Sequence, residues 1–74
     1  MTTKINEQFS LQVETFMRVY NEIPGTEWKK FHHNSTTGNI EILHGRIHSN
    51  GQRERAIAQI FITPKGNVIK HALL

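Results

Sequence analysis

The chain has 74 residues, of which 36% are hydrophobic and 20% charged, with a formal net charge of +3 and no cysteine. This length allows one domain with a small core, and the lack of cysteine excludes both a disulfide framework and a Cys-based zinc site. The longest apolar runs, such as Ile60 to Ile62, are too short for a membrane-spanning helix or a signal peptide. We therefore expect a small basic cytoplasmic protein with a single domain, residues 1–74, and no membrane contact.

The charge is distributed unevenly along the chain. Residues 1–27 have two basic and four acidic side chains, a net of −2, whereas residues 28–74 have seven basic and two acidic ones, a net of +5. All five histidines also lie in the second part. This asymmetry favours a basic surface that suits an anionic partner, although a mild positive charge also serves solubility alone.

The first predicted element is an amphipathic helix over residues 6–23. Its apolar side chains recur at spacings of three and four residues, which places them on one stripe that faces a core; they are Phe9, Val13, Phe16, Met17, Tyr20 and Ile23. Asn6 is the predicted N-cap, and Pro24-Gly25 ends the helix.

A β-meander is predicted over residues 27–73. Residues 27–33 form its first strand, and with His33 opposite Ile40 the indole of Trp28 covers Gly45 in the neighbouring strand. Two further strands, residues 39–49 and 52–63, flank Asn50-Gly51, which predicts a two-residue type I′ turn. A last strand, residues 67–73, follows a turn at residues 63–67. The predicted fold class is α+β, with an N-terminal amphipathic helix packed on a three- to four-stranded antiparallel sheet.

The type I′ turn fixes a register in which Arg46 pairs with Arg55, and side-chain alternation then assigns two faces. The face expected beneath the helix comprises Leu43, Ile47, Ala56, Ala58, Ile60 and Ile62. Near the turn, the opposite face presents candidate nucleic-acid contacts, which are Arg46, Arg53, Arg55, His44 and His48. Farther from the turn it presents an apolar patch, which a protein partner or a second copy is expected to bury: Ile40, Ile42, Ile57, Phe61, Ile69 and Leu73.

The residue types argue against chemistry on a substrate. His44 and His48 lie about 13 Å apart along a strand, too far to share one metal ion, and aspartate is absent along with cysteine. No serine lies in a Gly-x-Ser-x-Gly elbow, and there is no phosphate-binding glycine loop. We expect no catalytic residues, no metal and no cofactor.

Two functional hypotheses remain. The first is a non-enzymatic protein that binds DNA or RNA through the basic hairpin face and forms a homodimer. Arginine suits this task because its planar guanidinium binds phosphate bidentately and releases counterions, and such binding would offset the repulsion between the paired Arg46 and Arg55. The alternative is a protein–protein interaction module, a small inhibitor or adaptor, that uses the apolar end of the sheet.

Overall fold

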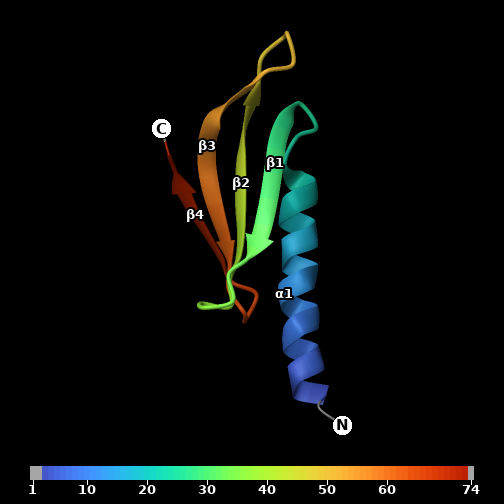
Figure 1. Ribbon diagram of the computed structural model, residues 1–74. Coiled ribbons are helices and arrows are strands. Elements are labelled where there is room, and N and C mark those ends of the chain that lie inside the picture. The colour runs from blue at the N-terminus through green and yellow to red at the C-terminus, as the bar shows by residue number, and fades with distance from the viewer. Residues whose placement is uncertain (1–2, 74) are drawn as a thin grey trace.

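The computed structural model describes the backbone of residues 3–73 and the side chains of residues 10–73. One helix, α1 (Thr3–Glu22), precedes four strands: β1 (Glu27–His33), β2 (Ile40–Ile47), β3 (Arg53–Ile62) and β4 (Val68–Ala72). The strands form one antiparallel sheet in the order β1-β2-β3-β4, as Figure 1 shows. The predicted α+β fold, a helix followed by an antiparallel meander, is confirmed. In the described part of the chain, no helix is long and apolar enough to cross a membrane.

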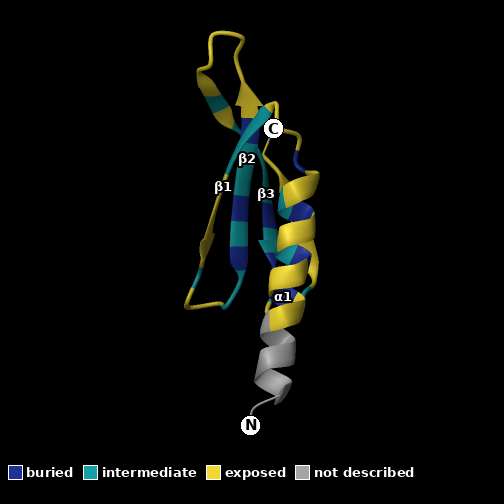
Figure 2. Cartoon of the chain, turned by 90° about the vertical axis from the view of Figure 1, so that its right-hand side faces the viewer, coloured by how far each residue is buried: buried dark blue, intermediate teal, exposed yellow. Residues whose placement is uncertain are grey.

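Helix α1 lies along one face of the sheet (Figure 2). It begins at Thr3, ahead of the predicted start, and the side chains of Asn6 and Phe9, predicted as cap and core, lie outside the described residues. The buried side chains of α1 are Gln12, Thr15 and Val19, and Ile23 is buried just beyond its end. The stripe is therefore rotated from the predicted one, and Met17 is 55% exposed.

Aromatic packing explains this rotation. Phe16 and Tyr20 are only half-buried, because they lie at the border of the helix and pack against Phe31 of β1, with ring centroids 4.6 and 5.5 Å away. The helix thus presents its smaller buried side chains to the sheet and its largest ones to the β1 edge. Lys29 of β1 adds a tie on the same side, since its Nζ donates a 2.9 Å hydrogen bond to the Tyr20 carbonyl.

The hydrophobic core lies between α1 and the ends of β2 and β3 that are distant from their shared turn. Ile40 pairs with Ile62 and Ile42 with Ile60, so four isoleucines form one block beneath the helix. Ile60 and Ile62 were predicted there. Ile40 and Ile42 were predicted in the exposed patch, and this is wrong because the register of β2 and β3 differs from the predicted one; Ile42 has 0% exposure.

The turn between β2 and β3 is the source of the error. His48 N–H donates to the Gln52 carbonyl and Gly51 N–H donates to the His48 carbonyl, both at 2.8 Å. Gly51 has a φ of 89°, and no described non-glycine residue has a positive φ. This geometry matches a three-residue hairpin loop with glycine in the left-handed position. The predicted type I′ turn, which needs a positive φ at Asn50 as well, is wrong.

Strand β3 is also irregular along its length. Its ten residues lie opposite the eight of β2, and the register shifts on both sides of Gly45. Such β-bulges bend and twist a strand. The predicted pairing of Gly45 with Ala56 is present, whereas the core half and the turn half are each displaced by one residue. Leu43, predicted beneath the helix, consequently lies on the opposite face.

Strands β1 and β4 pair as predicted. His33 lies opposite Ile40 and Trp28 opposite Gly45. Strand β4 runs beside β3, where Ile69 pairs with Phe61.

Candidate nucleic-acid interface

The outer ends of β2 and β3 with their turn, residues 46–55, form a projecting ribbon that we call the arginine hairpin. Pairing between β1 and β2 ends at Glu27 and Arg46, so no described strand flanks β2 beyond that point. Figure 1 shows the ribbon extending past the ends of β1 and α1. It contributes to the elongated shape of the chain, which measures 51 × 21 × 16 Å. Both faces of the ribbon tip are consequently accessible.

All three predicted arginine contacts are exposed on this hairpin: Arg46, Arg53 and Arg55. The ion pairs among the described side chains are three histidine–glutamate pairs, and none of them involves an arginine. Within residues 10–73, the three guanidinium groups are therefore without a carboxylate partner. Their donor groups remain available to an external anion.

The arginines do not share one face, as the predicted register required. Arg53 lies over the Trp28 ring, with its guanidinium carbon 5.8 Å from the ring centroid, which places it on the sheet face turned away from α1. Arg46 lies opposite Glu27 of β1, and strand alternation places it on the helix side with His44. Arg46 therefore has an acidic cross-strand neighbour in β1. Arg46 and Arg55 are not paired across the strands, so the repulsion predicted between them is no argument for an anion site.

The two histidines predicted as contacts are engaged with glutamates. His44 Nδ1 lies 2.7 Å from Glu27 Oε1, and the His44 side chain is only 14% exposed. His48 Nδ1 lies 3.3 Å from Glu54 Oε2 at the more exposed hairpin end. His44 is thus enclosed against β1, whereas His48 stays accessible. The first pair could have been predicted from the pairing of β1 with β2, because that register places His44 diagonally across from Glu27.

Trp28 secures the base of the arginine hairpin. Its indole N–H donates a 2.8 Å hydrogen bond to the Glu54 carbonyl, in the stretch of β3 where the register shifts. The indole lies against Gly45 so closely that a Cβ there would be 2.7 Å from Trp28 Nε1 and 2.7 Å from the Arg55 carbonyl oxygen. The covering of Gly45 was predicted, but the hydrogen bond was not. Trp28 thereby ties β1 to the base of the ribbon.

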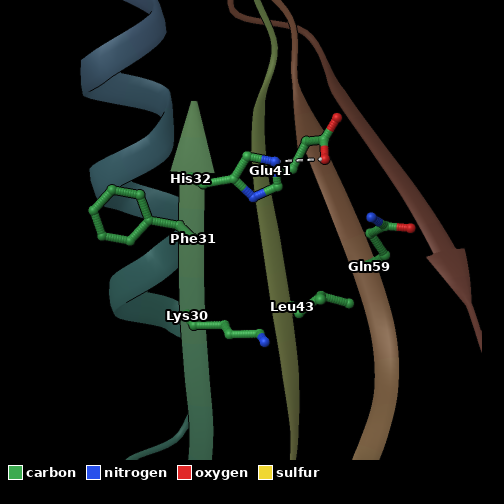
Figure 3. A pocket seen from close by; sticks show the side chains of 6 residues that line it. All are labelled: Lys30, Phe31, His32, Glu41, Leu43 and Gln59. Carbon is green, nitrogen blue, oxygen red and sulfur yellow. Dashed lines mark ion pairs between the residues drawn. The ribbon is translucent and has the colours of Figure 1, made fainter. Parts of the chain in front are cut away.

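Two further features of the described residues concern metal ions and pockets. Within them, no group of three or more His, Cys, Asp or Glu side chains is placed to hold a metal ion. A shallow hollow lies on the sheet, lined by Lys30, Phe31, His32, Glu41, Leu43 and Gln59. Figure 3 shows the ion pair that crosses it, in which His32 Nε2 lies 3.1 Å from Glu41 Oε1. Glu41 also accepts a hydrogen bond from the Asn34 amide, so this carboxylate is held by two partners.

Comparison of this chain with models of protein families, with curated proteins and with solved structures finds no match. Its function is therefore inferred from its own residues and geometry.

Proposed function

We propose that this chain is a non-enzymatic protein that binds double-stranded DNA through the arginine hairpin. The observation that supports this most strongly is the set of three exposed arginines, without described carboxylate partners, on a ribbon that projects past α1 and β1. A two-stranded ribbon fits the major groove of B-DNA, which is about 12 Å wide.

The placement of arginines on both faces suits a ribbon inserted edge-first into a groove. Arg46 on one face and Arg53 on the other reach phosphates on opposite groove walls, whereas a one-faced cluster reaches a single wall. The cation–π contact with the Trp28 ring restricts the Arg53 side chain before binding, which lowers the entropy lost when a phosphate is bound. Most contacts are then to phosphate, so binding has little dependence on sequence.

Three phosphate contacts give a measurable salt dependence. The logarithm of the affinity falls with the logarithm of the salt concentration with a slope of about −0.9 per contact, hence about −2.7 per hairpin. Raising salt fourfold from about 50 to about 200 mM then weakens binding about 40-fold. At physiological salt we expect dissociation constants in the non-specific range of about 10⁻⁴ to 10⁻⁶ M.

Fluorescence anisotropy with a labelled DNA duplex tests the proposal. Arg46→Gln, Arg53→Gln and Arg55→Gln should each weaken binding and flatten the salt slope by up to about 0.9. Arg18→Gln is the matched control, because Arg18 is also exposed but lies on α1, away from the hairpin. Absence of binding at low salt contradicts the proposal, and so does an equal loss in the Arg18 variant. A single-stranded probe and an RNA duplex, measured in parallel, show whether groove shape matters.

A second candidate is a protein–protein interaction module, favoured by apolar side chains on the sheet face that α1 does not cover. Ile69 is 45% exposed and Leu73 is 47% exposed on β4 and just beyond it. A pull-down with nuclease treatment separates the two functions, because a protein partner survives the nuclease and depends on Ile69 rather than on Arg53.

A further inference from the structure

At the tip of the arginine hairpin, Asn50 is the one asparagine of the chain that a glycine follows. An asparagine side chain can react with the main-chain nitrogen of the next residue, closing a succinimide ring. A glycine nitrogen is the least hindered of these nucleophiles, because glycine has no Cβ. The chain has six asparagines, which are Asn6, Asn21, Asn34, Asn39, Asn50 and Asn67.

The reacting pair is accessible to water. Asn50 and Gly51 are both exposed, and a Cβ built on Gly51 would meet nothing within 4 Å. Pairing between β1 and β2 ends at Arg46, and Figure 1 shows the tip beyond the ends of β1 and α1. No described element therefore shields the peptide bond that joins the two residues.

The Asn50 side chain is folded back on the main chain that follows it. Its Oδ1 accepts a 3.0 Å hydrogen bond from the Gln52 N–H. This donor draws electron density from the amide carbon Cγ, which favours attack by a nucleophile there. The Asn34 amide is fixed at both ends instead, since its Nδ2 donates to Glu41 Oε2 at 3.1 Å and its Oδ1 accepts from the Thr36 N–H at 2.9 Å.

The Gly51 nitrogen is held by the turn in the closed hairpin. Its N–H donates a 2.8 Å hydrogen bond to the His48 carbonyl, so this bond has to open before the nitrogen attacks. Every residue from Arg46 to Arg53 is exposed, and segments without buried apolar contacts open locally at little cost in free energy. The opening therefore leaves the core of the protein intact.

We propose that Asn50 is a site of intramolecular modification, at which the chain converts its own asparagine to aspartate or isoaspartate. The Gly51 nitrogen bonds to Asn50 Cγ while the bond from Cγ to Nδ2 breaks, and the amide group leaves as ammonia with the proton of the Gly51 N–H. Water then opens the succinimide ring. Opening at the side-chain carbonyl gives aspartate, and opening at the main-chain carbonyl gives isoaspartate.

Either product adds a carboxylate to the arginine hairpin. Residues 46–55 have three arginines and one glutamate, a net charge of +2 with histidine neutral, which the modification lowers to +1. Isoaspartate also inserts a carbon atom into the main chain of the turn. The reaction thus reduces the attraction of the hairpin for phosphate as the chain ages. This consequence rests on the proposed function, whereas the modification itself does not.

Peptide mapping by mass spectrometry of the folded chain, incubated at neutral pH, tests the modification. Asn67 is the matched internal control, because it is also exposed and next to a turn but precedes the β-branched Val68. Asn50 should convert at least about tenfold faster than Asn67, which corresponds to a barrier lower by about 1.4 kcal/mol. In the Asn50→Ser variant, whose hydroxyl can still accept from the Gln52 N–H, the hairpin peptide should keep its mass. Conversion of Asn50 no faster than that of Asn67 overturns the proposal.

Asn50→Asp tests the consequence for DNA binding separately, since it has the charge of the product and an unaltered main chain. In the anisotropy assay it should weaken duplex binding and flatten the salt slope by up to about 0.9, whereas Asn50→Ser should change neither. An unchanged salt slope in Asn50→Asp overturns this consequence. Absence of duplex binding by the wild type refutes the proposed function, and the mass measurement decides on the modification in either case.

Discussion

Gly45→Ala is the substitution that most directly probes the base of the arginine hairpin. At this position the β2–β3 register shifts, the Trp28 indole covers the backbone, and the Arg55 carbonyl approaches from β3. An added Cβ would lie 2.7 Å from the Arg55 oxygen and 2.7 Å from Trp28 Nε1. Neither atom belongs to a free side-chain end, because the first is backbone and the second is held by its hydrogen bond to Glu54.

The cost follows from these contacts. Overpacking a fitted site costs about 1–3 kcal/mol, and weakening the Trp28 hydrogen bond adds about 1 kcal/mol. We expect Gly45→Ala to lower the free energy of unfolding by about 2–4 kcal/mol, a large part of the stability of a small domain. With a urea m-value of about 1 kcal/mol/M, the denaturation midpoint falls by about 2–4 M.

Urea denaturation followed by tryptophan fluorescence measures this loss, at one fixed protein concentration so that association does not alter the comparison. Gly25→Ala is the matched control. Gly25 has no positive φ, and a Cβ there meets nothing within 4 Å, so this change should be neutral or stabilise by about 0.4–1 kcal/mol. Equal effects of the two substitutions would refute the close approach at Gly45.

Two further predictions concern the packing of α1 on the sheet and use the same denaturation assay. Gln12→Leu should cost about 1–3 kcal/mol, because the buried Gln12 amide donates to the carbonyls of Gly38 at 2.7 Å and Ile62 at 3.1 Å; a neutral result would mean that these hydrogen bonds add no stability. Ile42→Ala should cost about 2–5 kcal/mol, whereas Met17→Ala, at a mostly exposed position, should cost less than about 0.5 kcal/mol. If Met17→Ala cost more than Ile42→Ala, the faces predicted from the sequence, with Met17 in the core and Ile42 exposed, would be right and the observed packing wrong.

The sequence was sufficient for the element order and for the β1–β2 pairing. Pro24-Gly25 marked the end of the helical region, and the pairing of Trp28 with Gly45 followed from matching a large aromatic with a residue that has no side chain. The first signal is local in sequence, and the second depends on a single pair of residues with complementary sizes. Neither depends on the register of β2 and β3.

The faces of β2 and β3 were not predictable to the same degree. Asn50-Gly51 is compatible with a two-residue turn and with the three-residue loop observed, in which Gly51 alone has a positive φ. A displacement of one residue exchanges the two faces of a strand, so it moved Ile42 from the predicted patch into the core. The isoleucines themselves held the better signal, since pairing Ile40 with Ile62 and Ile42 with Ile60 gathers them beneath the helix.

The candidate site shows the same limit. The exposure of the three arginines followed from their charge. Their division between two faces depends on the β-bulges, and no residue type in β3 predicts where these bulges lie. The histidine–glutamate pairs join residues on adjacent strands, and His44 with Glu27 is apparent only once β1 is placed. The buried stripe of α1 was predicted wrongly for a related reason. The large aromatic side chains Phe16 and Tyr20 were placed at its centre, whereas they lie at its border and Val19 is buried.

Backbone amide chemical-shift mapping during titration with a DNA duplex tests the central claim most directly, because it locates the contact on the folded chain. The account predicts that the largest shift changes lie in residues 46–55, with the arginine hairpin affected from both faces, and that added salt reverses them. Changes centred on α1 or on the sheet face turned away from it, or no changes at low salt, would contradict it.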